Sequence, residues 1–293
     1  EGQIDDFRDN YDAVFLGALG DPRIPDMAHG RGILLAMRFE LDLFINLRPV
    51  KLLSEQLCPL KNKTIQDVDF VVFRENTEGE YVGAGGFLKK NTADEVAVQE
   101  AVHTRKGVER IIRAAFDFAQ KNNRPKVTMS DKSNVLRFGH DLWQRVFRSV
   151  GEEYPDIEKE HFYVDALVME LIRRPEHFEV IVTENMLGDI VTDAGAMLQG
   201  GLGMAASGNI HPGQTSLFEP VHGSAPPLAG KNPANPIAAI LTAALMLQHL
   251  DFGKAAHRIE KAVEQAVAQQ KTTPELGGTL GTREVGDYIA GQL

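Results

Sequence analysis

Residues 183–210 read TENMLGDIVTDAGAMLQGGLGMAASGNI and combine an acidic pair, a helical apolar pattern and a cluster of glycines. Asp189 and Asp193 are four residues apart, a spacing that places both carboxylates on one face of a helix. Two like charges so close repel unless a cation or proton joins them, and carboxylate oxygens suit Mg²⁺ or Mn²⁺. The structural alternative makes Asp189 a helix cap after Gly188 and Asp193 a solvated acid favoured by the helix dipole. On spacing alone this alternative is the commoner one, so the rest of the chain must decide.

Short apolar runs alternate with amphipathic segments along the chain. The sequence predicts buried strands at residues 13–19, 69–73, 125–131 and 178–182. It predicts helices at residues 33–44, 105–120, 166–172, 237–250, 255–269 and 285–293. There is no internal repeat, and the alternation predicts an α/β protein. Glycines between 200 and 208 predict a turn, and residues 216–236 predict a long loop.

A hairpin-like arm is predicted between the strands at 69–73 and 125–131. Residues 95–103 alternate between polar and apolar types, and they can pair with residues 82–90. An exposed arm of this kind needs a partner to cover it.

Several charged residues follow predicted strands or begin predicted helices. Lys132 comes directly after the strand at 125–131; such a lysine is commonly a surface residue, but beside acids and a metal it can accept a proton. Asp165 begins an apolar helix and is either a helix cap or a third metal ligand. Arg38 and Arg48 are either surface residues or parts of a common cleft.

Composition excludes several classes of function. The chain has 293 residues, 43% of them hydrophobic, and a formal net charge of −10, which argues against nucleic acid or an anionic membrane surface as the main partner. Its single cysteine, Cys58, excludes an internal disulfide and fits a cytoplasmic location. No apolar run is long enough to cross a bilayer, and residues 1–10 do not resemble a signal peptide. Dinucleotide-binding and Walker glycine fingerprints are absent.

Six segments in order resemble one family: NLRPVK (46–51), FRENTEGEY (73–81), DKSNVL (131–136), YVDA (163–166), TENMLGDIVTDAG (183–195) and FEPVHGSAP (218–226). They are similar to the isocitrate and 3-isopropylmalate dehydrogenases, which are β-decarboxylating dehydrogenases. The resemblance runs from about residue 12 to the C-terminus. The family's opening strand and Gly-Asp-Gly turn are not found, so we expect an incomplete cofactor domain and leave open whether this chain is active.

The resemblance implies a two-domain α/β fold with a central mixed sheet, not a standard Rossmann fold. The cofactor-binding large domain would comprise residues 1–43 and 200–293. The inserted small domain, residues 44–199, would carry the arm and the dimer interface. The active site would be shared between the two subunits of a homodimer.

The resemblance also implies roles for the candidate residues in the oxidative decarboxylation of a 2-hydroxy dicarboxylic acid. Mg²⁺ or Mn²⁺ would be bound by Asp189, Asp193 and, from the second subunit, Asp165. The substrate's carboxylates would be held by Arg38, Arg48 and Arg74. Two residues would move protons: Lys132 of the neighbour would take the proton of the C2 hydroxyl, and Tyr81 would protonate the enol left after CO₂ departs.

For the cofactor, the matching positions are His222, Gly223, Ser224, Ala225 and Asn235. Pro227 stands where NAD-dependent relatives have an aspartate and NADP-dependent isocitrate enzymes have a lysine. We expect NAD because that lysine is absent, with Glu275 as a substitute ribose partner. Pro227 leaves the choice between NAD and NADP open.

For the substrate, the residues before Arg38 are informative. Leu34 and Leu35 suit an isopropyl group and would leave a third carboxylate unpaired, which favours 3-isopropylmalate. D-malate or tartrate is the alternative, because those enzymes also have two leucines here, and homoisocitrate or isocitrate comes next. A silent regulatory subunit is the non-enzyme alternative; the presence of Lys132, Tyr81 and all three arginines argues against it.

Overall fold

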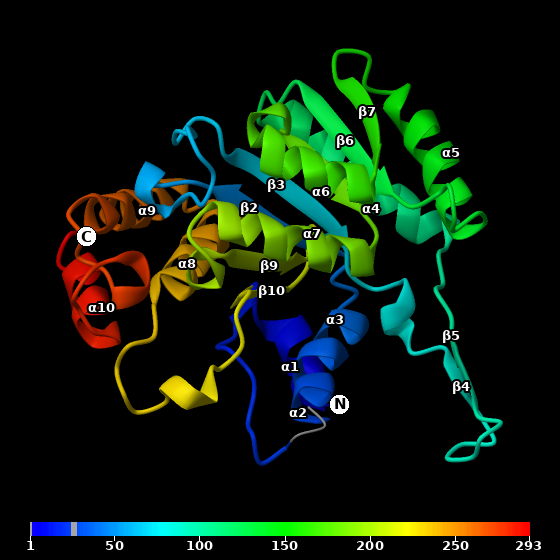
Figure 1. The fold of residues 1–293 in the computed structure, drawn as a ribbon, viewed down its shortest axis with the longest axis horizontal. Helices are drawn as coiled ribbons and strands as arrows, with labels where there is room; N and C mark the ends of the chain where they lie inside the picture. The colour runs from blue at the N-terminus through cyan, green and yellow to red at the C-terminus, as the bar shows by residue number, and fades with distance from the viewer. Residues whose placement is uncertain (1, 25–27) are drawn as a thin grey trace.

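A computed structural model describes residues 2–24 and 28–293, and within them a mixed sheet has the order β1-β10-β9-β2-β3-β8-β6-β7 (Figure 1). Its strands are β1 (Ala13–Phe15), β2 (Ile45–Lys51), β3 (Asp69–Glu75), β6 (Lys126–Asp131), β7 (Glu158–Tyr163), β8 (Val180–Thr183), β9 (Ala206–Ile210) and β10 (Ser216–Pro220). Strands β10, β9, β2 and β3 pair with one another in antiparallel fashion, in that order, and the remaining neighbouring strands are parallel. The predicted α/β class and mixed sheet are therefore confirmed.

Helices cover both faces of this sheet. They are α1 (Gly2–Asn10), α2 (Ala28–Gly30), α3 (Ala36–Glu40), α4 (Arg105–Lys121), α5 (Gly139–Gly151), α6 (Val164–Arg173), α7 (Asn185–Leu198), α8 (Ile237–His249), α9 (Gly253–Ala268) and α10 (Thr282–Ala290). One apolar core joins the sheet to α4 and α5, and a second joins its other face to α6 and α7. Helices α1 and α3 pack beside β1 and β10. None of the described helices is long and apolar enough to cross a membrane.

Strand alternation decides which side chains reach the α7 side of the sheet. In β3, Phe70 and Val72 pack in the core beneath α6 and α7, whereas Val71 and Phe73 face α4. Arg74 continues the first series and therefore lies beneath α7. Asn46 is the direct partner of Arg74 on β2, and Arg48 is two residues further along the same face.

Several predicted elements differ in the structure. Residues 2–10 form a helix, and β1 ends at Phe15 although residues 13–19 were expected to be a strand. The single helix expected at 33–44 is a π-helical turn, Arg31–Leu35, followed by α3. The expected glycine turn and the start of the expected loop contain β9 and β10, which lie inside the sheet. Strand β9 lacks the apolar pattern of a buried strand partly because it contains Gly208. A glycine is required there, since a Cβ would lie 2.9 Å from the ring of Phe218.

The predicted arm is confirmed as a hairpin. Strands β4 (Gly85–Leu88) and β5 (Val96–Gln99) are antiparallel, and Figure 1 shows them extending away from the rest of the chain. All eight of their residues are exposed, including Phe87 and Leu88. At the base of the arm, Gly85 has φ +151° and approaches the carbonyl of Val98 too closely for any side chain.

The sheet is continuous across the two predicted domains. Strands β1, β9 and β10 come from residues 1–43 and 200–293, and the other five come from residues 44–199. The boundary between the domains stays a prediction.

Candidate active site

A cleft of about 330 Å³ lies between α3, α7 and the ends of β9 and β10. Its lining draws on segments from both ends of the chain. Nine of the residues predicted for the site line it: Leu34, Leu35, Arg38, Arg48, Arg74, Tyr81, Asp189, His222 and Gly223. The structure therefore brings together the residues predicted for the substrate's carboxylates, one predicted metal ligand and the start of the predicted cofactor loop.

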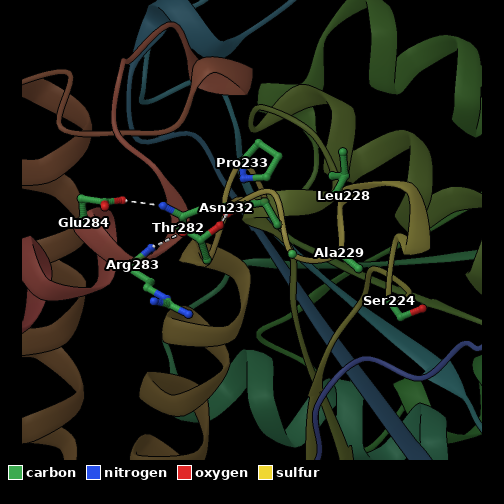
Figure 2. Close-up of a pocket in the computed structure, with 10 residues that line it drawn as sticks. Ser224, Leu228, Ala229, Asn232, Pro233, Thr282, Arg283 and Glu284 are labelled. Carbon is green, nitrogen blue, oxygen red and sulfur yellow. Dashed lines mark hydrogen bonds between the residues drawn. The ribbon is translucent and has the colours of Figure 1, made fainter.

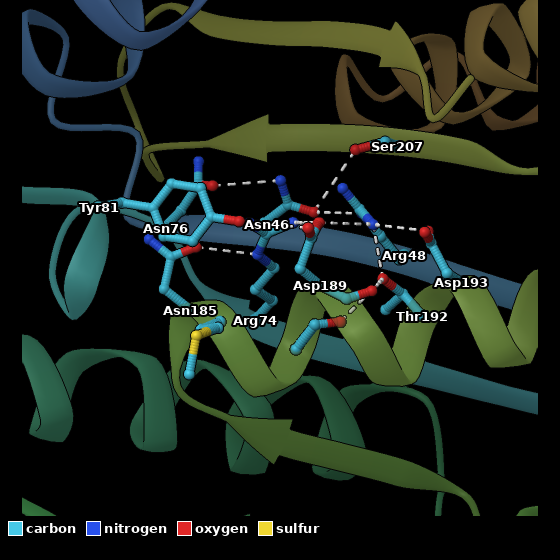
Figure 3. A network of polar contacts seen from close by, with 12 residues as sticks. Asn46, Arg48, Arg74, Asn76, Tyr81, Asn185, Asp189, Thr192, Asp193 and Ser207 are labelled. Atoms are coloured by element: carbon cyan, nitrogen blue, oxygen red, sulfur yellow. Dashed lines mark hydrogen bonds and ion pairs between the residues drawn. The ribbon is translucent and has the colours of Figure 1, made fainter. Parts of the chain in front are cut away.

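Arg74 is the centre of a polar network on the α7 side of the sheet (Figure 3). Its side chain is almost completely buried; Nε donates to Asn185 Oδ1 at 3.0 Å, and Nη1 forms an ion pair with Asp189. The guanidinium also lies over the ring of Tyr81, 5.3 Å from its centre, and the Tyr81 hydroxyl donates to Asp189 Oδ2 at 3.2 Å. Burial raises the pKa of Tyr81, so its phenol is protonated at neutral pH and can donate a proton.

Arg48 lies on the other side of Asp189. Its Nη1 donates to Thr192 Oγ1 at 2.5 Å and is 3.6 Å from Asp189 Oδ1 and 3.9 Å from Asp193 Oδ1. Burial, followed by repulsion from Arg74, lowers the pKa of Arg48 to about 9, so the side chain is still charged at neutral pH. A bound anion would stabilise this charge.

Arg38 forms the third cationic position. Its Nη2 donates to Glu219 Oε1 at 3.1 Å, and Nε is buried with no hydrogen-bond partner among the residues that the structure describes. Burial lowers the pKa of Arg38, and the nearby Glu219 opposes that effect. An unpaired buried N–H costs free energy, so an acceptor from a ligand is favoured here.

Three buried asparagines support the arginines; the sequence indicates Asn76, which directly follows the strand predicted at 69–73 and Arg74, but it does not identify Asn46 or Asn209. Asn46 Nδ2 donates to Asn76 Oδ1 at 3.2 Å and to Asn209 Oδ1 at 3.0 Å, while its own Oδ1 accepts from Arg48 Nε at 2.9 Å. Glu219, which accepts from Arg38 and Asn209, was also missed because its strand was expected to be a loop. The available signal for Asn46 was its place on the face of Arg48 in a buried strand.

Asp189 and Asp193 project from the middle of α7. The helix begins at Asn185, and its cap is Glu184, which accepts from the backbone N–H groups of Met186 and Leu187. The structural alternative for Asp189 as a helix cap is therefore wrong. Burial raises the pKa of Asp189, but the charges of Arg74 and Arg48 outweigh burial and the pKa is lowered overall. Burial raises the pKa of Asp193, and Asp189 adds to the increase.

The donor set of this acidic pair fits a hard divalent ion. Both carboxylates are partly exposed on one helix face, as an oxygen-ligated cation requires. Among the described residues, no group of three His, Cys, Asp or Glu side chains is placed to hold a metal. Asp189 and Asp193 would therefore supply two ligands, and further ligands must come from substrate, water or another molecule.

Lys132 and Asp165 are not part of this cleft. Lys132 Nζ lies 2.6 Å from Asp165 Oδ1, and the Asp165 carboxylate is largely exposed. Asp165 lies in the first turn of α6 without acting as its cap. The structure thus brings these two predicted residues together, but away from Asp189 within one chain.

The predicted cofactor residues divide into three places. His222 and Gly223 line the cleft, whereas the Ser224 hydroxyl donates to the Gly20 carbonyl at 2.6 Å and borders a recess of about 450 Å³ (Figure 2). Ala225 follows with a left-handed φ of 44°. Asn235 and Glu275 do not line that recess; their side chains meet over Gly203, where a Cβ would lie 2.8 Å from each.

Replacing Gly188 with alanine is expected to displace Arg74. The new Cβ would lie 2.6 Å from Arg74 Cγ and 2.8 Å from its Cβ, and these atoms at the base of the side chain cannot move aside cheaply. We expect the free energy of unfolding to fall by about 1–3 kcal/mol, measured by urea denaturation. The matched control is Gly286→Ala in α10, where nothing lies within 4 Å of the new Cβ. A Gly188→Ala protein as stable as this control would contradict the expected clash.

The fold and the cleft define an α/β protein in which three buried arginines and Asp189 line one cleft, with Asp193 one helical turn further along α7. The sequence model of the isocitrate/isopropylmalate dehydrogenase family matches residues 4–289. The chain belongs to the isocitrate/isopropylmalate dehydrogenase family, and the resemblance predicted from its motifs is confirmed.

Individual relatives agree with this assignment. The 3-isopropylmalate dehydrogenase of Thermobifida fusca is 46% identical over 282 residues, which cover 96% of this chain and 79% of that protein. The enzyme of the same name from Streptomyces coelicolor is also 46% identical, over 94% of this chain and 81% of that protein. The crystal structure of isocitrate dehydrogenase from Methylococcus capsulatus superimposes with a TM-score of 0.89 at 38% identity, covering 100% of this chain and 84% of that chain.

Proposed function

We propose that this protein catalyses the metal-dependent oxidative decarboxylation of a 2-hydroxy dicarboxylic acid, with 3-isopropylmalate as substrate and NAD as oxidant. The observation that carries the proposal is the convergence of Arg38, Arg48 and Arg74 on one cleft with Leu34 and Leu35. The two carboxylates of 3-isopropylmalate match the arginines, and its branched isopropyl group matches the leucines. The printed name of the relatives that are 46% identical supports the same substrate.

The charges of the cleft are consistent with a dianion bound together with a divalent cation. Three guanidinium groups face three carboxylates, those of Glu219, Asp189 and Asp193, so the protein's own charges cancel. A cation of charge 2+ and a dianion add no net charge. Arginine is suited to this task because its planar fork matches a carboxylate with two parallel hydrogen bonds.

In the proposed reaction each residue acts at a defined atom. The three arginines bind and orient the two carboxylates, and Asp189 and Asp193 hold Mg²⁺ or Mn²⁺. Lys132 takes the proton of the C2 hydroxyl. When bound, the cation would supply Lewis-acid polarisation of the oxygen on C2, and the nicotinamide would supply the oxidant for the hydride of C2. After CO₂ leaves, Tyr81 donates its phenolic proton to C3, completing the product.

Lys132 and Asp165 enter this scheme from a second copy of the chain. The pair is exposed and lies outside the cleft of its own chain, so it is available to the cleft of a partner. Exposed apolar side chains on α6 and α7, among them Met169, Ile172 and Ile190, offer a surface for that partner. The arm offers another. A homodimer with two shared sites is the simplest assembly.

NAD is preferred over NADP in this proposal because Pro227 offers no charge to a phosphate. We give Glu275 less weight as a partner of the cofactor's ribose, since its carboxylate lies over Gly203 and does not line the recess beside Ser224. A cytoplasmic location remains a prediction from the single cysteine.

The test is nicotinamide reduction by the purified protein with Mg²⁺ or Mn²⁺. The acids compared are 3-isopropylmalate, D-malate, D-tartrate, isocitrate and homoisocitrate, each with NAD and with NADP. Highest kcat/KM for 3-isopropylmalate with NAD supports the proposal. A preference for D-malate or tartrate would identify a different substrate but leave the proposed oxidative decarboxylation unchanged. Absence of turnover from a folded, metal-loaded dimer would favour the silent subunit.

Replacing Leu34 with serine is expected to reduce the preference for a branched substrate. Leu34 is half-buried in the cleft wall, and a serine there removes apolar surface that an isopropyl group would contact. We expect kcat/KM for 3-isopropylmalate to fall about 10–200-fold, while the value for D-malate changes little. Measuring both acids with the same preparation provides the internal control. An equal loss for both acids would place Leu34 outside the specificity pocket.

A further inference from the structure

The turn that carries Lys132 has little apolar support. Between β6 and α5, Val135, Leu136 and Phe138 are all exposed, and Phe138 is 94% exposed. A segment whose large side chains face solvent gains little from burial, so its position depends on polar contacts. Two residues of α5, His140 and Gln144, provide such contacts to the start of the turn.

His140 contacts the backbone of Lys132 directly. The backbone N–H of Lys132 donates to His140 Nδ1 at 2.7 Å, and the imidazole is 1% exposed. Nδ1 must therefore carry the lone pair, and the ring proton is on Nε2. Burial lowers the pKa of His140 to about 4, with a further contribution from His103, so the ring remains a neutral acceptor at physiological pH.

The neighbouring residue, Asp131, is held from the same helix. Its buried carboxylate accepts from Gln144 Nε2 at 2.8 Å, from the backbone N–H of Ser133 at 3.0 Å, and lies 2.9 Å from His161 Nε2. His140 and Gln144 are four residues apart and so share one face of α5. Together they hold the backbone before the Lys132 Cα, and the bond from Ser133 to Asp131 holds the backbone after it.

We propose that His140 is a positioning residue for Lys132: its Nδ1 holds the Lys132 amide and thereby aims the side chain toward Asp165 and the partner's cleft. The inference rests on the proposed function, in which Lys132 takes the hydroxyl proton. A displacement of about 1 Å at such a group can cost 10²-fold in rate, so a single backbone hydrogen bond is sufficient to matter.

Two variants of His140 distinguish the effect of its hydrogen-bond acceptor from the effect of its ring volume. His140→Leu keeps a side chain of moderate size but removes the acceptor, whereas His140→Asn can place its Oδ1 where Nδ1 was. His249→Leu is the control, because His249 is a partly buried histidine that packs against Phe218, far along the chain from the turn.

In full-length, metal-loaded enzyme we expect His140→Leu to lower kcat at least 10-fold, with KM for the hydroxy acid changed less than about 3-fold. His140→Asn should recover most of kcat, and His249→Leu should leave it unchanged. A value of kcat within twofold of wild type in folded His140→Leu would overturn the inference. Equal losses in the leucine and asparagine variants would also overturn it, since ring volume would then be responsible.

A second measurement does not depend on turnover. Hydrogen exchange of the peptide covering residues 131–138 should be faster in His140→Leu than in wild type or His140→Asn. An unchanged rate of hydrogen exchange would contradict the positioning role of His140 even if Lys132→Met proves inactive. Conversely, faster exchange together with full activity of Lys132→Met would remove the proposed function and, with it, the need to position this lysine.

Discussion

Replacing Lys132 with methionine is expected to lower kcat by about 10²–10⁴-fold, the usual contribution of a positioned proton acceptor. Methionine keeps a long unbranched side chain but cannot take the proton of the C2 hydroxyl. KM should change little, because the carboxylates are held by arginines in the other copy. The control is Lys254→Met, an exposed lysine on α9. Lys132→Met with more than a tenth of wild-type kcat would contradict the role.

Mixing two inactive proteins tests whether the site is shared. Lys132→Met and Asp189→Asn damage opposite halves of the proposed site, so a hybrid dimer contains one site with both native residues. Random reassociation of equal amounts is expected to restore about a quarter of wild-type activity. If both residues served one chain's own cleft, every hybrid would lack an intact site, and no activity would return. The Lys132–Asp165 pair, exposed and outside the cleft, leads us to expect recovery.

Replacing Arg74 with methionine is expected to reduce kcat/KM about 10²-fold or more. Three partners lose their contact at once: the Asp189 carboxylate, the Asn185 amide oxygen and the ring of Tyr81. Asp189 is two-fifths exposed, so water replaces part of the lost interaction, and we expect only about 1–3 kcal/mol of lost stability.

Arg74→Lys distinguishes charge from geometry at this position. Lysine keeps the positive charge, but it cannot donate to Asn185 and Asp189 in the fork arrangement of arginine. We expect it to recover stability but less than half of the lost transition-state binding, measured as kcat/KM. Arg145→Met, which removes an exposed arginine paired with Asp141, is the control and should change neither quantity. A similar loss in the control would mean that net charge, and not the buried network, controls activity.

Much of the site could be predicted from the sequence because its residues follow recognisable strands and helices. Arg74 follows a clear apolar run, and the spacing of Asp189 and Asp193 already placed both on one helix face. Glu219 could not be predicted, since residues 216–236 predict a loop and the pairing of β10 with β1 joins opposite ends of the sequence. Likewise, nothing local relates Asn46 to Asn76 and Asn209, which meet only after three strands align.

The placement of Lys132 and Asp165 has a different explanation. Their types and positions left both roles open, and only the family resemblance implied catalysis, metal binding and a place in the second subunit's site. Their ion pair within one chain is new information from the structure. It joins the end of β6 to the start of α6, two elements that the sequence predicted without a contact between them.

The ion pair between Arg38 and Glu219 also constrains the order of events during protein synthesis. Its two residues are 181 positions apart, so one wall of the cleft cannot close until the ribosome has made the 181 residues that lead from Arg38 to Glu219. At about 5–20 residues per second, Arg38 spends roughly 10–40 s without its partner. During that time the Arg38 guanidinium lacks the Glu219 carboxylate, and α3 lacks the β10 residue Leu217 to pack against. Helix α3 is therefore among the last parts of the cleft to become stable, although it leaves the ribosome long before β10.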